Sequence, residues 1–149
     1  MHIGLRRHAK LWSVMGFSTE FYQQGVWRGF GFTSVEDFMT GFLEAYFLPM
    51  DANDLLCMGW KWQHGDVSRH TGGDLAAALG RIEARTFVMP IDEDMFFPPR
   101  DCEAECKLTP NAELRVLKTP CGHLVLNGLD PAWMAQVDKH LGELLALPA

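Results

Sequence analysis

The sequence predicts an α/β fold built on parallel strands, and three observations carry this expectation. Residues 85–89 and 114–117 are short, mainly apolar runs that contain residues favoured in strands. A helical stretch, 99–108, separates the two, and a crossover of this kind joins parallel strands. Residues 1–73 have a helical pattern, so only two strands are visible, whereas a stable sheet needs three or more. Either further strands lie unrecognised among the helices, or the chain is the C-terminal part of a larger α/β protein.

Length and composition narrow the classes of protein to consider. A chain of 149 residues with 48% hydrophobic residues is the size of one domain and can bury a core. Its net charge of -6 argues against a nucleic-acid binder, which would need a basic surface. No apolar stretch approaches the roughly 20 residues that span a bilayer, and the charged N-terminus has no apolar region after it. We therefore expect no nucleic-acid partner, no membrane span and a cytoplasmic location.

Helix signals dominate the first half of the chain. We expect helices from Leu5 to Met15, from Val35 to about Phe47, from after Asp51 to near Gly65, and from Leu75 to Leu79. Ser34, Asp51 and Asp74 stand where N-caps are expected, and Asp37 follows Ser34 at the spacing of a capping box. The glycine-rich segment Gly25 to Gly31 reads as a turn. Residues 1–73 are therefore expected to form a helical cap segment.

The second half alternates between strand and helix. After the strand at 114–117, Asp130 can cap a last amphipathic helix that has Pro131 at its first position. Residues 74–149 thus read as strand, helix, strand and helix, preceded by the short helix at Leu75–Leu79. We expect this segment to be the C-terminal part of an α/β core.

An acid and a histidine occupy the loops after the two strands. Asp94 follows the first strand, and His123 follows the second in Pro120-Cys121-Gly122-His123. Because parallel strands end at the same edge of a sheet, both loops should lie side by side. An acid that orients a histidine provides two of the three members of a catalytic triad. On pattern alone, Asp92 and Asp94 could equally be turn or capping residues, and His123 a surface histidine.

A nucleophile for such a triad is not evident. The serines are Ser13, Ser18, Ser34 and Ser68, and none lies in a Gly-x-Ser-x-Gly elbow. The nearest is Ser18 in Gly16-Phe17-Ser18-Thr19-Glu20, which lacks the second glycine and follows a helix instead of a strand. Cys121 lies close to His123 in sequence, but no cationic group or helix N-terminus that would activate its thiol is evident.

Metal and disulfide chemistry are also not expected. The remaining cysteines are Cys57, Cys102 and Cys106, of which the last two share one face of a helix without a Cys-x-x-Cys motif. His64 and His70 flank a loop and read as solvated side chains. We therefore assign no metal and no bound cofactor to the chain.

Several segments resemble the homoserine O-acetyltransferase-like branch of the α/β-hydrolases. The segment Ile91 to Pro99 resembles the acid loop of that branch, and Gly122-His123 resembles its histidine loop. Asp51 to Leu56 is similar to a lid helix, and Leu75 to Ile82 is similar to the short helix before the acid strand. The resemblance implies the C-terminal portion of an α/β-hydrolase fold, with residues 1–73 as its lid.

The same resemblance assigns roles to the two loop residues. Asp94 would be the triad acid and His123 the base, because Phe97-Pro98 follows Asp94 in the register of the family; Asp92 is the competing acid. The chain departs from the family at two positions. Leu124 stands where the acetyltransferases carry an acid that holds the amino-acid substrate, and Cys121 replaces an aromatic residue. The elbow serine and the oxyanion-hole segment of the family lie upstream of the lid, where this chain begins.

The resulting expectation is the C-terminal part of a serine-dependent acyltransferase or hydrolase. Its substrates would be a small-molecule acyl donor and acceptor, and its partner a separate N-terminal half or a second copy bound through the lid. The alternative is a non-catalytic, truncated or partner-binding protein with relic catalytic loops. A helical ligand-binding module is a third interpretation, which leaves the acid and histidine loops unused.

Overall fold

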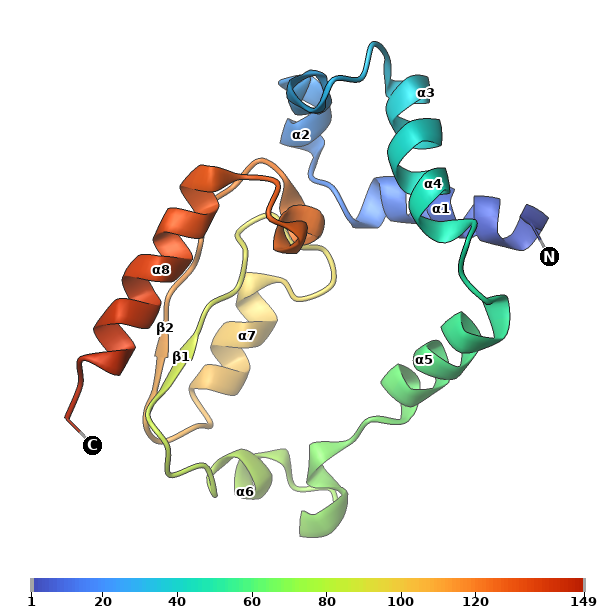
Figure 1. Ribbon diagram of the computed structural model, residues 1–149. Coiled ribbons are helices and arrows are strands. Elements are labelled where there is room, and N and C mark those ends of the chain that lie inside the picture. The colour runs from blue at the N-terminus through green and yellow to red at the C-terminus, as the bar shows by residue number, and fades with distance from the viewer. Residues whose placement is uncertain (1, 149) are drawn as a thin grey trace.

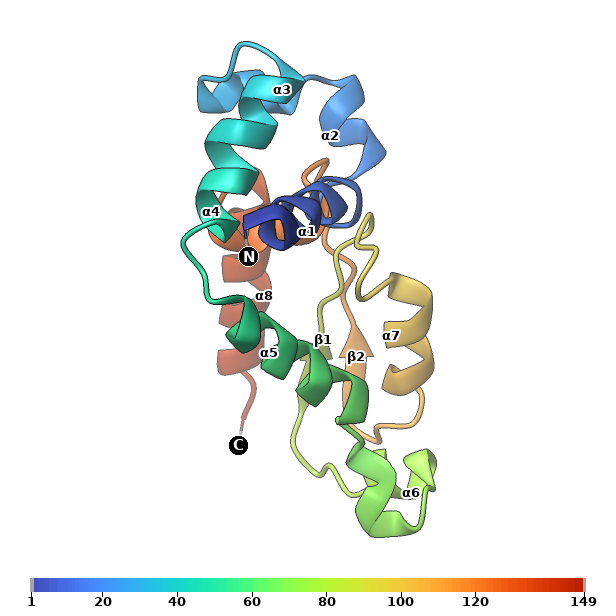
Figure 2. The same ribbon diagram turned by 90° about the vertical axis from the view of Figure 1, so that its right-hand side faces the viewer.

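The computed structural model describes residues 2–148. The α-helices are α1 (His2–Met15), α2 (Thr19–Gln23), α3 (Val35–Phe38), α4 (Ala45–Phe47), α5 (Ala52–His64), α6 (Leu75–Leu79), α7 (Pro99–Cys106) and α8 (Pro131–Leu145). The strands are β1 (Thr86–Val88) and β2 (Ala112–Leu114), and three 3-10 helices span Val26–Phe30, Val67–Thr71 and Gly122–Asn127. Figures 1 and 2 show α1 to α4 grouped at one end, with β1, β2, α7 and α8 next to them, while α5 runs alongside toward α6 at the opposite end.

Side-chain caps start the helices at the positions that the sequence predicts. The carboxylates or hydroxyls of Ser34, Asp51, Asp74 and Asp130 each accept a hydrogen bond from a backbone N–H in the first turn of α3, α5, α6 and α8. The expected capping box at Ser34 is only half present. The carboxylate of Asp37 accepts from the N–H of Thr33, at 2.9 Å, instead of returning to Ser34.

The predicted helix from Val35 to Phe47 is continuous but not regular. A π-helical stretch, Met39–Glu44, joins α3 to α4. The glycine-rich turn before it is a 3-10 helix, bounded by Gly25 and Gly31 with φ of 64° and 89°. Both angles lie in the left-handed region that favours glycine, so the turn forms where the glycines allow it.

The two strands pair in parallel, as the crossover through α7 predicts. Thr86, Phe87 and Val88 lie opposite Ala112, Glu113 and Leu114. Pairing extends beyond β2 as a bridge between Ile91 and Leu117. The observed strand β2 therefore begins and ends earlier than the predicted strand at 114–117, although residues up to Leu117 still pair.

Helices α7 and α8 lie on opposite sides of this small sheet (Figures 1 and 2). All three residues of β1 are only half-buried, and β2 alternates between half-buried and exposed. Parallel sheets are normally buried on both faces, because they have helices on each side. The coverage of this sheet is therefore partial within residues 2–148.

One hydrophobic core joins the two halves of the chain. From the first half it contains Ala9, Phe17, Phe21, Trp27, Phe38, Leu43 and Phe47, and from the second Ile91, Leu117, Cys121, Leu124, Val125 and Trp133. The helical segment is thus packed directly on the ends of the strands. Across residues 2–148, no helix has the length and hydropathy of a membrane span.

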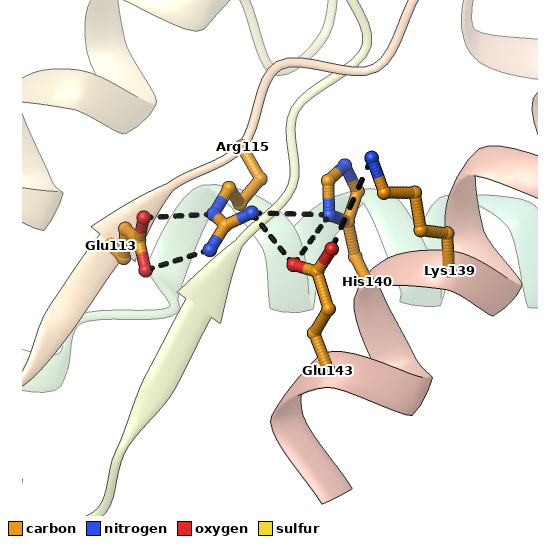
Figure 3. Close-up of polar contacts among 5 residues, drawn as sticks. All are labelled: Glu113, Arg115, Lys139, His140 and Glu143. Atoms are coloured by element: carbon orange, nitrogen blue, oxygen red, sulfur yellow. Dashed lines mark hydrogen bonds and ion pairs between the residues drawn. The ribbon is translucent and has the colours of Figure 1, made fainter. Parts of the chain in front are cut away.

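A polar cluster ties the end of β2 to α8 (Figure 3). The guanidinium of Arg115 lies 2.9 Å from Glu113 through Nε and 2.9 Å from Glu143 on α8 through Nη1. It also lies over the ring of Phe87, 4.6 Å from the ring centre. His140 is 3.6 Å from Glu143 on the same helix. These contacts hold α8 against the strands from which the acid and histidine loops emerge.

Candidate active site

Asp94 and His123 meet beyond the carboxyl ends of the two parallel strands. Nδ1 of His123 lies 2.8 Å from Oδ2 of Asp94, which is hydrogen-bond distance. The side chains are 3% and 15% exposed for Asp94 and His123, respectively. The two loops therefore lie side by side, as the parallel pairing predicts, and they hold an acid–histidine pair that is largely shielded from water.

The acid loop keeps Asp94 ionised. Its other oxygen, Oδ1, accepts hydrogen bonds from the backbone N–H groups of Phe96 and Phe97, at 2.7 and 3.1 Å. Burial acts to raise the pKa of Asp94, but the hydrogen bonds from His123, Phe97 and Phe96 outweigh it and hold that pKa below its ordinary value. An ionised Asp94 accepts from Nδ1–H of His123, which leaves Nε2 as the nitrogen that can accept a proton.

Asp92, the competing acid, makes different contacts. Its Oδ1 accepts from the N–H of Thr119 at 3.2 Å and from the N–H of Glu93 at 3.1 Å. Asp92 thereby links the start of the acid loop to the start of the histidine loop. Asp94, and not Asp92, is the carboxylate that contacts His123.

The histidine loop is held by residues 16–18, which join α1 to α2. The N–H of Leu124 donates to the carbonyl of Gly16 at 2.9 Å, and the hydroxyl of Ser18 donates to the carbonyl of Pro120. Gly122 has a φ of 66°, and a Cβ at this position would lie 2.8 Å from the backbone nitrogen of Ser18. Glycine is therefore required immediately before His123, both for its conformation and for this close approach.

All four serines make structural hydrogen bonds, and only Ser18 makes one to a distant part of the chain. Ser18 also accepts from the N–H of Phe21 and so caps α2, in addition to its bond with Pro120. The others bond as follows: Ser13 to the carbonyl of Lys10, Ser34 to the N–H of Asp37, and Ser68 to the carboxylate of Asp66. These contacts explain the serines as capping and turn residues.

Cys121 is buried beside the histidine loop and is 1% exposed. Burial raises the pKa of its thiol, against a smaller opposing effect of Thr119. A thiol with a raised pKa is protonated at neutral pH and is a poor nucleophile, so the geometry does not favour a Cys–His pair. Within residues 2–148, no three His, Cys, Asp or Glu side chains are grouped as metal ligands.

Aromatic rings surround the imidazole of His123. The ring centres of Phe96, Phe97 and Trp12 lie 4.7, 5.8 and 5.9 Å from that of His123. Trp12 lies in the helix expected from Leu5 to Met15, and no sequence motif assigned it to the site. The pair of phenylalanines that begins two residues after Asp94 was the available signal, because a loop that places an acid at the sheet edge also places its neighbours there.

A cavity of about 310 Å³ adjoins His123. Its lining is mainly apolar and includes Trp12, Phe47 and Leu124, with His8 on one wall. Burial lowers the pKa of His8, and its Nε2 accepts from the indole N–H of Trp12 at 2.9 Å. A larger groove between α1 and α5 shares His8 with this cavity but does not include His123. The smaller cavity is therefore the one that can bring a neutral, apolar molecule to His123.

Known proteins resemble the chain strongly over part of their length. It is 57% identical over 146 residues to an ethyl acetate hydrolase from Pseudomonas veronii, a match that covers 98% of this chain and 42% of the relative. The structure of the acetyl esterase MekB superposes with a TM-score of 0.95 at 55% identity, over 98% of this chain and 42% of that one. An acetylester hydrolase from Corynebacterium glutamicum gives a TM-score of 0.92 at 59% identity, over 95% of this chain and 40% of that one.

Weaker matches extend to the transferases. A homoserine O-acetyltransferase from Salinibacter ruber is 34% identical over 94 residues, which is 58% of this chain and 26% of the relative. No family model matches the chain. The expected branch is thus supported only as far as the superfamily, with esterases as the stronger matches.

The chain spans about two-fifths of the length of the esterases that it matches. Over that span, it has the fold of the C-terminal portion of an α/β-hydrolase.

Proposed function

We propose that this chain supplies the acid and the base of a Ser-Asp-His triad in an enzyme that cleaves or transfers the acyl group of small esters. The contact between Nδ1 of His123 and Oδ2 of Asp94, at 2.8 Å, carries the proposal. Ester cleavage is favoured over transfer to homoserine because the strongest matches are named as esterases. The resemblance of the acid loop to the homoserine O-acetyltransferase-like branch relates the two activities without assigning an acceptor.

The roles follow from the chemistry of the pair. Nε2 of His123 would accept the proton of a serine hydroxyl as that oxygen attacks the ester carbonyl, and would return it to the leaving alcohol. The ionised carboxylate of Asp94 would hold the imidazole in the required tautomer and stabilise the imidazolium that forms. A water molecule, deprotonated by Nε2 in the same way, would then attack the acyl-serine, releasing the carboxylic acid and restoring the serine.

The serine would come from a segment that pairs with this chain. Half-buried residues on both strands support such a partner, because further strands and helices would complete their burial. In this assembly, residues 1–73 would be the helical lid over the 310 Å³ cavity, and residues 74–149 part of the core. That segment would be the N-terminal half of the fold. A homodimer through the lid is an alternative assembly, which would not itself supply the serine.

A chimera tests the proposal. This chain would replace the matched 146-residue segment of the Pseudomonas veronii ethyl acetate hydrolase, and hydrolysis of p-nitrophenyl acetate would be measured. We expect turnover by the chimera and none above background by the 149-residue chain alone. His123→Ala should lower kcat of the chimera by roughly 10³-fold or more, and His70→Ala, at an exposed histidine, should leave it unchanged.

The same chimera distinguishes the two acids. Asp94→Asn should reduce kcat far more than Asp92→Asn, because only Asp94 contacts His123. A larger loss from Asp92→Asn would overturn the assignment of the acid. A folded chimera that retains turnover with Ala at position 123 would refute the role of the base.

A catalytically silent binding protein is the second candidate. The observation in its favour is the apolar surface of α5, where Leu56, Met58 and Trp60 are 72%, 65% and 60% exposed. Such exposure is typical of surfaces that contact a partner. A folded chimera without ester turnover would favour this candidate over the enzyme.

A further inference from the structure

The two phenylalanines of the acid loop contact both members of the Asp94–His123 pair. Their backbone N–H groups donate to Oδ1 of Asp94, at 2.7 Å from Phe96 and 3.1 Å from Phe97. Their rings pack against the imidazole of His123 at centroid distances of 4.7 and 5.8 Å. Any displacement of this dipeptide therefore changes the hydrogen bonds of the acid and the packing of the base together.

Trp62 of α5 stacks on this dipeptide from outside. Its ring lies 5.5 Å from that of Phe96 at an interplanar angle of 26°, and 5.9 Å from that of Phe97 at 31°. Helix α5 has no buried residue, and its partly buried Leu55 packs against the core. The contact of Trp62 is thus a link between the helical segment and the acid loop, made by a side chain that is itself 57% exposed.

Trp60 shows that this contact is specific to one position of the helix. It lies on α5 two residues earlier and is exposed to a similar degree, 60%. Its ring stacks instead on His64 of the same helix, at 4.3 Å and 20°. The two tryptophans therefore share a helix, a size and an exposure, and differ in whether they contact the acid loop.

We propose that Trp62 is a positioning residue, which holds Phe96 and Phe97 over the Asp94–His123 pair and couples the placement of α5 to the geometry of that pair. Its relevance to catalysis rests on the proposed function. The physical reason is that offset-stacked rings restrict one another, and the backbone donors to Asp94 belong to the residues whose rings are restricted. A triad acts only when its members are held in productive geometry, so a loosened acid loop lowers the rate without removing a catalytic group.

The first test uses the 149-residue chain itself. The titration of the Asp94 carboxyl would be followed by carbon NMR, and the hydrogen-bonded Nδ1 proton of His123 by proton NMR. With Trp62→Ala, we expect the pKa of Asp94 to rise toward its ordinary value, because its backbone hydrogen bonds weaken. The Nδ1 proton signal should broaden through faster exchange.

Matched variants separate positioning from general damage. Trp60→Ala should leave the pKa of Asp94 and the Nδ1 proton signal of His123 as in the unmodified chain. Trp62→Phe, which keeps an aromatic ring, should keep both close to those of the unmodified chain. Circular dichroism would establish that each variant is folded, as expected for a change at an exposed side chain. Identical signals in Trp62→Ala and the unmodified chain, or an equal effect of Trp60→Ala, would overturn the proposal.

A kinetic test in the chimera distinguishes positioning from substrate contact. Trp62→Ala should lower kcat with little change in KM, since it displaces the acid and base without removing a binding group. A raised KM with unchanged kcat would identify Trp62 as a substrate contact and overturn the positioning role. A chimera without any turnover would count against the proposed function alone, because the NMR measurement still decides whether Trp62 positions the pair.

Discussion

Asp94 accepts hydrogen bonds from one side chain and two backbone groups, and its response to acid follows from them. His123, Phe96 and Phe97 all favour the ionised carboxylate, and their combined effect exceeds that of burial. A group whose folded-state pKa is depressed stabilises the fold above its unfolded pKa, and this contribution is lost as pH falls through the folded value. The acid–histidine pair is therefore a source of stability at neutral pH that disappears in acid.

We predict that Asp94→Asn weakens the dependence of stability on pH. The urea midpoint of the unmodified chain should fall as pH decreases from neutral to below the pKa of Asp94, and the midpoint of Asp94→Asn should fall less. Chemical unfolding followed by circular dichroism across that pH range would measure both. Glu93→Gln, which removes an exposed neighbouring carboxylate, is the control. Parallel pH profiles for Asp94→Asn and the unmodified chain would contradict this account of Asp94.

A second prediction concerns the glycine before His123. Gly122 and Gly128 both have left-handed backbone, with φ of 66° and 76°, but only at Gly122 would a Cβ meet the backbone of Ser18, at 2.8 Å. Gly128→Ala should cost roughly 1–2 kcal/mol for the conformation alone. Gly122→Ala should cost more, because Ser18 or the histidine loop must also move. If urea unfolding showed that Gly122→Ala and Gly128→Ala lower the free energy of unfolding equally, the close approach to Ser18 would carry no additional cost.

Among the elements, those determined by local interactions were predicted from sequence with correct type and nearly correct ends. Asp51, Asp74 and Asp130 each cap the helix that the sequence analysis assigned to them, because a cap depends on only a few neighbouring residues. The π-helical stretch Met39–Glu44 was not predicted, since its apolar pattern also fits a regular helix. The strand predicted at 114–117 lies later in the chain than β2. Its last residue, Leu117, still pairs with Ile91, but as an isolated bridge beyond β2.

The candidate site was predictable only in part, for the same reason. The spacing and the strand ends indicated that Asp94 and His123 would meet, and they do. The contact of Ser18 with Pro120 joins residues 102 positions apart, and no local sequence pattern predicts it. Nor did the sequence indicate that Trp62, on a largely exposed helix, would stack on the acid loop.

Arg115 provides a prediction at the scale of packed elements. It connects β2 to α8 through Glu143 (Figure 3). It also lies over the ring of Phe87. Glu143→Gln should lower the melting temperature only slightly, and less at high salt, because partly exposed ion pairs are weak and screened. Arg115→Ala should lower it more and with less salt dependence, since it also removes the packing on Phe87. If both variants lowered the melting temperature equally, and high salt removed both effects, only the charge of Arg115 would contribute to stability.

For the whole molecule, the shared core implies that residues 1–73 and 74–149 unfold as one unit. Phe38, which is fully buried, belongs to the same core as Ile91, Leu117 and Trp133 of the second half. We predict that Phe38→Ala destabilises the chain by about 3–5 kcal/mol. Hydrogen exchange should show that the amides of α1 and of β1 lose the same free energy of protection.

Tyr46→Ala, at a side chain that is 51% exposed on α4, is the control and should have a small effect. Two separate transitions, or loss of protection in the first half only, would show instead that the helical segment unfolds independently. That outcome would favour two domains over one cooperative structure.

The acid–histidine pair also has a consequence for the order of folding. Asp94 and His123 are 29 positions apart, whereas the bond from Ser18 to Pro120 spans 102. Closing a short loop costs less entropy, so contacts of low sequence separation tend to form first. We expect the Asp94–His123 pair to form with α7 early in folding. The hydrogen bonds between residues 16–18 and the histidine loop should form late. Mutations at Ser18 should then speed unfolding more than they slow folding.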